Sequence, residues 1–108
     1  MSFKTINANY NLIGGDHNFD PVQVDGENII VAVDFTNLSN NTATVELHQS
    51  VDKIIWGVVP DSNKALIAGQ TSHAWNVIGL VTGAYLRVSL KPNTCTGIVN
   101  NIKVLSNE

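Results

Sequence analysis

Residues 44–59, TVELHQSVDKIIWGVV, constrain the fold more than any other stretch, because apolar and polar side chains alternate along them. Side chains on a β-strand alternate between its two faces, so one face would hold Val45, Leu47, Gln49 and Val51, and the other Thr44, Glu46, His48, Ser50 and Asp52. A turn at Asp52-Lys53 and an apolar run with Trp56 predict a returning strand. The stretch is therefore expected to form an amphipathic hairpin, with one face in a core and the other open to water or a partner.

Other short stretches with strand-like patterns are separated by turn residues. Residues 29–36 (IIVAVDFT) and 85–90 (YLRVSL) alternate most clearly, and 29–36 is expected to pair with 44–51 as a hairpin. The remaining expected strands are residues 3–13, 22–24, 65–68, 72–80 and 98–105. No stretch shows a convincing helical period. The pattern predicts an all-β chain without significant helix, a single antiparallel β-sandwich of about seven to nine short strands.

Residues 1–12 have two possible roles within this single domain of residues 1–108. Their even-numbered side chains from Lys4 to Leu12 could face a core, which would make the segment a first or edge strand. Alternatively, the segment could be an N-terminal arm that extends the sheet of a neighbouring molecule by main-chain pairing. In that case, deleting residues 1–11 should abolish partner binding and leave a folded domain.

The composition excludes several classes of partner. The 108 residues carry a formal net charge of −3, so there is no basic surface for nucleic acid and no polybasic segment for anionic lipid. Polar residues and glycines interrupt the uncharged stretch 65–86, which argues against a membrane span. Cys95 is the only cysteine and is expected to be a small half-buried residue. The N-terminus lacks the apolar region of a secretory signal, so synthesis and folding in a cytoplasm are expected.

No catalytic, cofactor-binding or metal-binding residues are predicted, and the chain is not expected to be an enzyme. His48, Ser50 and Asp52 suggest a triad, but alternate residues of a strand lie about 6.6 Å apart, too far for mutual hydrogen bonds. The acidic residues between positions 16 and 27 match no calcium-binding loop and are interpreted as turn residues. The three histidines lack the spacing of zinc ligands.

The two tryptophans differ in what their surroundings predict. Trp56 is in phase with Ile54 and Val58, which favours packing in the core over a flat platform for a sugar ring. Trp75 lies beside Asn76 and is in phase with His73 and Val77. Core packing is favoured for Trp75 too, but an interface or ligand role stays open.

Three segments together resemble discoidin-like and related β-sandwiches. Residues 47–56 (LHQSVDKIIW) are similar to their L-x-x-S-x-D-x-x-x-W turn, residues 84–90 (AYLRVSL) to a late core strand, and residues 96–105 (TGIVNNIKVL) to the closing strand. The match covers about half the chain, in the expected order, and implies a jelly-roll-like sandwich. The chain lacks the paired cysteines of the secreted members, and its length and neutral Asn/Thr-rich surface look like small structural sandwich proteins of tailed bacteriophages.

This resemblance implies a non-enzymatic virion structural protein, most simply a capsid auxiliary or decoration protein made in the host cytoplasm. Its partners would be the major capsid protein or other virion proteins, and it would be a homo-oligomer. The alternative is a carbohydrate-binding module, with Trp75 and the loops 16–20 and 37–41 around a glycan. The candidate interface residues are Phe3, Ile6, Tyr10, Glu46, His48 and Trp75.

Overall fold

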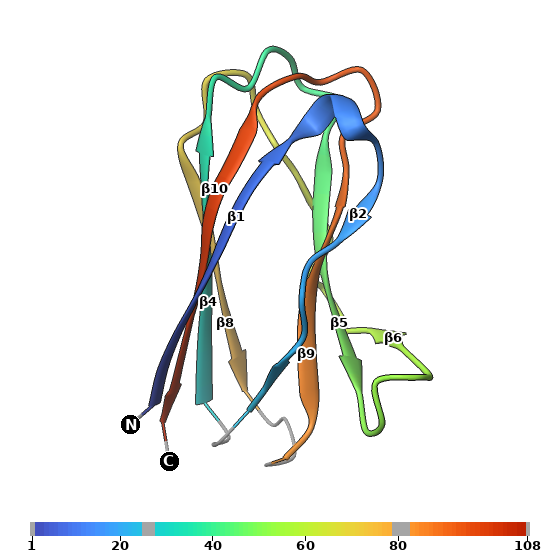
Figure 1. Ribbon diagram of the computed structural model, residues 1–108, viewed down its shortest axis with the longest axis vertical. Helices are drawn as coiled ribbons and strands as arrows, with labels where there is room; N and C mark the ends of the chain where they lie inside the picture. The colour runs from blue at the N-terminus through green and yellow to red at the C-terminus, as the bar shows by residue number, and fades with distance from the viewer. Residues whose placement is uncertain (1, 25–27, 79–82, 108) are drawn as a thin grey trace.

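Two antiparallel sheets packed face to face make up the computed structural model, which describes residues 2–24, 28–78 and 83–107 (Figure 1). One sheet has the order β1-β10-β4-β8, and the other has the order β2-β9-β5-β6, with β3 paired to β9 and β7 to β5. The long strands are β1 (Ser2–Asn11), β4 (Asn28–Thr36), β5 (Thr44–Ser50), β8 (Ser72–Ile78), β9 (Tyr85–Lys91) and β10 (Ile98–Asn107). The two-residue strands are β2 (His17–Asn18), β3 (Val22–Gln23), β6 (Gly57–Val58) and β7 (Lys64–Ala65), and η1 (Leu12–Gly14) is a 3₁₀ turn. The predicted antiparallel β-sandwich is confirmed.

The core lies between the sheets and follows the alternation of the sequence. In β4, Ile29, Val31 and Val33 are fully buried, as are Val45 and Leu47 in β5. The residues between them face outward, as period-two geometry requires. Cys95, expected to be half-buried, is fully buried. None of the helical turns in the described ranges is long and apolar enough to cross a membrane.

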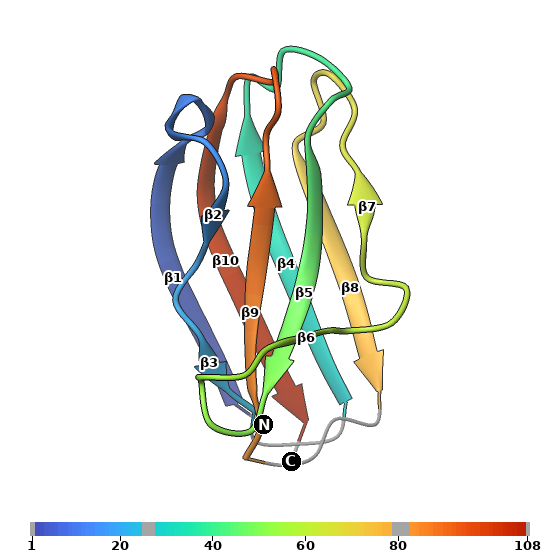
Figure 2. The same ribbon diagram turned by 90° about the vertical axis from the view of Figure 1, so that its right-hand side faces the viewer.

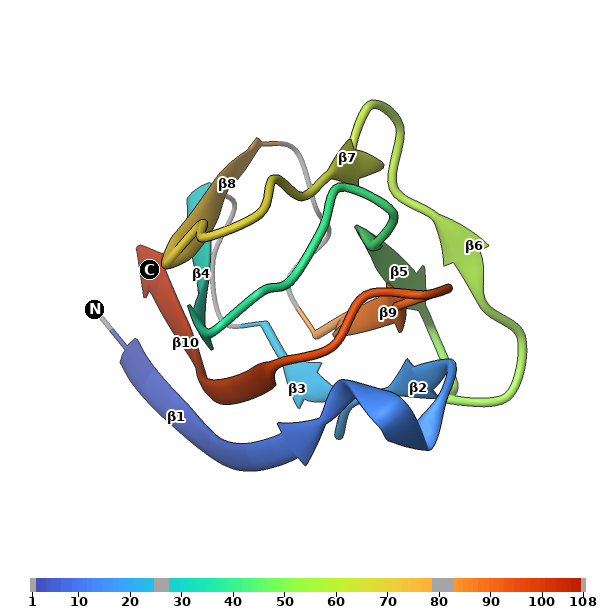
Figure 3. The same ribbon diagram turned by 90° about the horizontal axis from the view of Figure 1, so that it is seen from above.

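β1 forms one edge of its sheet and closes one side of the sandwich. It pairs with β10 from Ser2↔Ser106 to Asn11↔Ile98, and the chain then crosses through η1 to β2 in the other sheet (Figure 3). Two of the candidate interface residues, Ile6 and Tyr10, pack against the core of their own chain. Tyr10 stacks on His17 with ring centroids 4.3 Å apart, and its hydroxyl donates to the Gly15 carbonyl at 2.6 Å. The segment is an edge strand here, so deleting it removes part of this domain's own core.

The expected hairpin between residues 29–36 and 44–51 does not form. β4 and β5 lie in different sheets, and β5 pairs instead with β9, β6 and β7. The connecting loop of residues 37–43 crosses from one sheet to the other (Figure 2). Sequence alternation identifies strands and their inner faces, but it does not specify which strands pair.

The predicted returning strand of residues 54–59 is also wrong in large part. β5 ends at Ser50, and only Gly57 and Val58 pair with it again. Between them, the Ser50 hydroxyl accepts the backbone N–H groups of Asp52 and Lys53, at 3.2 and 2.9 Å. The Asp52 carboxylate accepts those of the next two residues, Ile54 and Ile55, at 2.9 and 3.0 Å. Side-chain acceptors thus satisfy the backbone that a strand would have paired, so Val51 and Ile54 are exposed and Trp56 lies outside the core.

Candidate functional site

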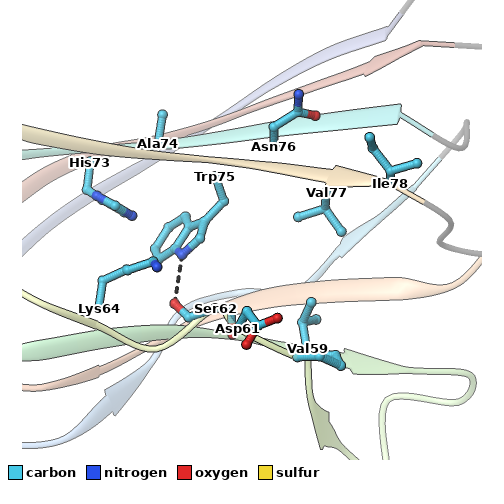
Figure 4. Close-up of a pocket in the computed structure, with 11 residues that line it drawn as sticks. Val59, Asp61, Ser62, Lys64, His73, Ala74, Trp75, Asn76, Val77 and Ile78 are labelled. Atoms are coloured by element: carbon cyan, nitrogen blue, oxygen red, sulfur yellow. Dashed lines mark hydrogen bonds between the residues drawn. The ribbon is translucent and has the colours of Figure 1, made fainter.

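A cleft of about 520 Å³ opens between β8 and the segment 59–64 (Figure 4). It lies on the side of the sandwich opposite β1 (Figure 3). His73, Trp75 and Val77 point from β8 toward that segment, and Ala74, Asn76 and Ile78 point away from it. The facing wall is formed by Val59, Pro60, Asp61, Ser62 and Lys64. Clefts of about 300–1,000 Å³ are typical of ligand sites, so this cleft is a candidate binding site.

Trp75 lies at the floor of the cleft and connects β8 to the facing segment 59–64. Its indole Nε1 donates to the Ser62 carbonyl at 2.7 Å, and its ring meets His73 edge-on at a centroid distance of 4.7 Å. Only 6% of the residue is exposed, so the prediction of core packing is confirmed. A sugar-stacking platform needs an open ring face, and this indole offers little of one.

His73 forms one end of the cleft and has an unusual environment. Its Nε2 atom is covered and lacks a hydrogen-bond partner in the described ranges. Burial, with a smaller contribution from the charge of Lys64, lowers the pKa of His73 below its ordinary value of 6.5. The imidazole is therefore neutral at pH 7 and carries an unpaired nitrogen.

Replacing His73 by phenylalanine is expected to raise the free energy of unfolding by about 1 kcal/mol, because a buried unpaired polar atom is removed and the ring is kept. The lowered pKa means that the unfolded chain binds a proton more readily than the folded one as the pH falls through 6.5. The wild type should therefore lose stability between about pH 7 and pH 5, and His73→Phe should lose less. Urea unfolding at both pH values measures this, and equal losses in the two proteins would contradict it.

A polar row crosses the outer face of the second sheet. Asn63 Nδ2 donates to Glu46 Oε1 at 2.9 Å, and Glu46 Oε2 lies 2.7 Å from His48 Nε2. Arg87 Nε donates to His48 Nδ1 at 3.2 Å, and its guanidinium lies 4.0 Å from the centre of the Trp56 ring. Arginine can only donate, so His48 carries its proton on Nε2 and donates it to Glu46. The hydrogen bonds from Asn63, and next from His48, lower the pKa of Glu46 below its ordinary value.

Pairing across strands explains why sequence reasoning missed part of this row. Glu46 and His48 were singled out from their shared strand face, whereas Arg87 comes from β9 and faces His48 only through the register of β5 and β9. The strand alternation of residues 85–90 places Arg87 on an outer face, but no sequence signal specifies its partner. Each named side chain of the row already has a partner, so the row is a structured polar surface.

The most exposed apolar surface is the loop of residues 51–58, called here the apolar loop. The exposed fractions of its aliphatic side chains are 86% for Val51, 80% for Ile54, 76% for Ile55 and 53% for Val58. The loop is ordered by the Ser50 and Asp52 hydrogen bonds and by Trp56 Nε1, which donates to the Lys53 carbonyl at 3.2 Å. Sequence periodicity placed Val51, Ile54 and Val58 on core-facing sides, although Ser50 and Asp52 are residues that often form turns.

The remaining predicted site residues do not gather at one place. Phe3 is exposed on the outer face of the first sheet, in register with Leu105, which in turn pairs with Ile30. Glu46 and His48 lie on the outer face of the other sheet, and Trp75 lies at the cleft. The six candidate interface residues therefore occupy separate surfaces, with Ile6 and Tyr10 turned inward.

The loop of residues 37–41, expected at the rim of a glycan site, is joined to the loop of residues 92–97. Asn40 Nδ2 donates to the Thr94 carbonyl at 3.2 Å, and Thr96 N donates to the Ser39 hydroxyl at 2.8 Å. Thr42 bonds both Asn40 and Thr94. These polar groups tie two loops together, which uses hydrogen-bonding capacity that a ligand would need.

The described residues do not form the His-Ser-Asp triad or the metal sites that were considered from the sequence. The spacing argument against a triad is wrong, because two pairs of alternate residues do form hydrogen bonds: Ser50 Oγ donates to Asp52 Oδ1 at 3.0 Å, and His48 Nε2 lies 2.7 Å from Glu46 Oε2. A triad is absent among these residues for another reason, since both ring nitrogens of His48 are engaged by Glu46 and Arg87. Within the described ranges, no three His, Cys, Asp or Glu side chains are placed to hold a metal ion. Two members of the acidic group, Asp25 and Glu27, lie outside those ranges.

Comparison with known proteins supports the architecture. No protein-family model matches the chain, and no curated protein matches it in sequence. Among solved structures, the Eiger TNF of S. frugiperda is similar with a TM-score of 0.55 and 11% identity, covering 98% of this chain and 92% of that one. TmCBM61, a carbohydrate-binding module solved in complex with β-1,4-galactotriose, is similar with a TM-score of 0.54 and 14% identity, covering 97% and 82%. The chain has a jelly-roll-like β-sandwich fold. At these identities the similarity concerns the fold alone, because one fold hosts many functions.

Proposed function

We propose that this chain is a non-enzymatic virion structural protein, a capsid auxiliary or decoration protein that docks onto other virion proteins. The apolar loop is the observation that carries the docking role, since an ordered group of exposed aliphatic side chains marks a protein contact. Burying one such side chain contributes about 1.5–3 kcal/mol. The virion setting is supported by the resemblance to small phage sandwiches and by the neutral Asn/Thr-rich surface.

Modest contacts are sufficient for stable binding when many subunits bind one lattice. When many copies are held together as a homo-oligomer or on a particle, each further contact becomes effectively intramolecular, and avidity exceeds the affinity of one site. The sandwich serves as a rigid block, since both faces of its core are built by long strands. The apolar loop projects from one end of this block, beside β5 and β6 (Figure 1).

The test replaces Ile54 and Ile55 by serine and measures co-sedimentation with particles assembled without this protein. Binding is expected to weaken at least about tenfold, because two exposed aliphatic groups that the contact would bury are lost. Unfolding should change by less than about 0.5 kcal/mol, as is usual for exposed positions. The matched control is Ile67→Ser, which changes an exposed isoleucine outside the loop and should leave binding intact. Unchanged binding of the double variant would refute the docking role of the loop.

A carbohydrate-binding module is the second candidate, favoured by the fold shared with TmCBM61 and by the cleft beside Trp75. The polar side chains Asp61 and Lys64 on its wall could meet sugar hydroxyls. A glycan array with the wild type and Asp61→Ala decides this candidate. Binding that is lost in the variant would support it, and absence of wild-type binding would exclude it.

A further inference from the structure

We infer that the cleft beside β8 is an acceptor groove for an extended peptide segment of a partner protein, which adds a strand to the free edge of β8. This inference goes beyond the proposed function, because it concerns a surface separate from the apolar loop. It rests on the direction of the main-chain groups of β8, on the absence of partners for them, and on the shape of the opposite wall.

The register of β4 and β8 fixes which main-chain groups face the cleft. Phe35 N donates to Thr71 O at 2.8 Å, and the same register continues through Val33↔His73 and Val31↔Trp75. In an antiparallel pair, residues that exchange hydrogen bonds alternate with residues that do not. His73 and Trp75 therefore bond β4, whereas Ala74 and Asn76 turn their N–H and C=O groups away from β4 and toward the cleft. This explains why Ala74 and Asn76 line the cleft although their side chains point elsewhere.

Within the described ranges, these main-chain groups have no hydrogen-bond partner. In the described part of the chain β8 pairs with β4 alone, and no hydrogen bond reaches the outward main-chain groups of Ala74 or Asn76. The Ser72 carbonyl, one step earlier on the same edge, is taken by Gln70 Nε2 at 2.9 Å. An unpaired edge is a template for another strand, and natural proteins usually cover or charge such edges. Between Ala74 and Ile78 this edge carries neither a charged side chain nor a proline.

The opposite wall of the cleft is formed by segment 59–64. Segment 59–64 meets β8 through the Trp75 indole, whose bond to Ser62 forms the floor of the cleft. Trp75, Val77 and Val59 make that floor apolar, and Lys64 and Asp61 lie on the wall. A strand in this groove would place alternate side chains on the apolar floor and the others in water. The ligand is thus an extended segment of about five residues, matching residues 74–78, with apolar residues at every second position.

An extended peptide fits these observations better than a sugar. The edge of β8 presents donors and acceptors at the repeat of a β-strand, about 6.6 Å, which is complementary to the main chain of another strand. A helix satisfies its own main chain and would leave the Ala74 and Asn76 groups unpaired. A glycan has no matching repeat of donors and acceptors, so glycan binding is an outcome of the test and not the proposal.

The test selects ligands from a displayed library of random heptapeptides against the wild type and against Ala74→Pro. Proline at position 74 removes an N–H that faces the cleft and none that bonds β4, so the sheet should be retained. Enriched peptides should shift the amide resonances of Ala74 and Asn76, and they should bind Ala74→Pro about tenfold more weakly, since one hydrogen bond is lost and a carbonyl is left unpaired. Ala74→Val keeps the N–H and is the matched control, expected to bind like the wild type.

A second measurement keeps the inference testable if Ala74→Pro does not fold. The best peptide is methylated on the amides that would face β8 and titrated into the wild-type protein, and its binding should be lost. The inference is overturned if no peptide is enriched, if the methylated peptide binds as well as the parent, or if β-1,4-galactotriose binds the cleft and no peptide does.

Discussion

Trp75→Ala should lower the free energy of unfolding by about 3–5 kcal/mol, the range expected when a large buried aromatic side chain is truncated. The substitution removes both packing contacts and a hydrogen bond. The indole fills the space between β8 and segment 59–64, and its Nε1 is the donor for the Ser62 carbonyl at 2.7 Å. Its removal leaves a cavity and an unpaired acceptor, against a total stability of about 5–15 kcal/mol for a domain of this size. Urea denaturation followed by circular dichroism measures the change.

Trp75→Phe is the matched control, because it keeps an aromatic ring and removes the indole N–H. A smaller loss than that of the alanine variant is expected, and the difference between the two variants reports the volume of the ring. An alanine variant as stable as the wild type would show that the indole does not join the walls of the cleft. The expected loss also means that absence of glycan binding in Trp75→Ala could reflect unfolding, so Asp61→Ala is the better variant for that question.

Strands whose inner residues are all apolar could be predicted from the sequence. Ile29, Val31 and Val33 alternate with outward residues in β4, and burial of one face is enough to specify strand and orientation. The same reasoning placed Trp75 and Val77 inward in β8. These local patterns are enough to predict the fold class, because each strand must bury its apolar face against another layer.

Pairing between strands could not be predicted, because it depends on residues far apart in the chain. The neighbours of β5 are β9, β6 and β7, and no local pattern separates this arrangement from a hairpin with β4. The polar row has the same origin, since Arg87 reaches His48 through the β5–β9 register. The free edge of β8 is likewise a property of sheet order, so the acceptor groove could be found only in the structure.

The prediction that residues of the apolar loop lie in the core was wrong for a different reason. Its residues repeat with the period of a strand, but Ser50 and Asp52 accept the backbone N–H groups that a strand would use. Apolar character alone was interpreted as burial, although much of the surface of any folded protein is apolar. Exposure of two isoleucines and two valines on one ordered loop therefore indicates a binding surface and not part of the core.

Deleting residues 1–11 should prevent stable folding, in contrast to what an independent arm would predict. Ile6 and Tyr10 leave the core with this segment, and the inner side chains of Ile102 and Val104 on β10 lose their neighbours on one flank. Each large apolar side chain contributes about 1.5–3 kcal/mol when buried, so the loss of several approaches the whole stability of such a domain. The amide NMR resonances of the truncated protein should lose their chemical-shift dispersion, and its thermal unfolding should show no cooperative transition.

Removing residues 1–3 alone separates the two roles of β1. Phe3 is 63% exposed on the outer face of the sheet, so this short truncation spares the core contacts of Ile6 and Tyr10 and should fold. If it folds and no longer binds particles, the start of β1 contributes to the partner contact by its exposed surface. A cooperative, folded protein lacking residues 1–11 would instead show that β1 is dispensable for the core and restore the arm as an independent element. The two truncations therefore distinguish a strand that holds this domain together from one that is available to a neighbour.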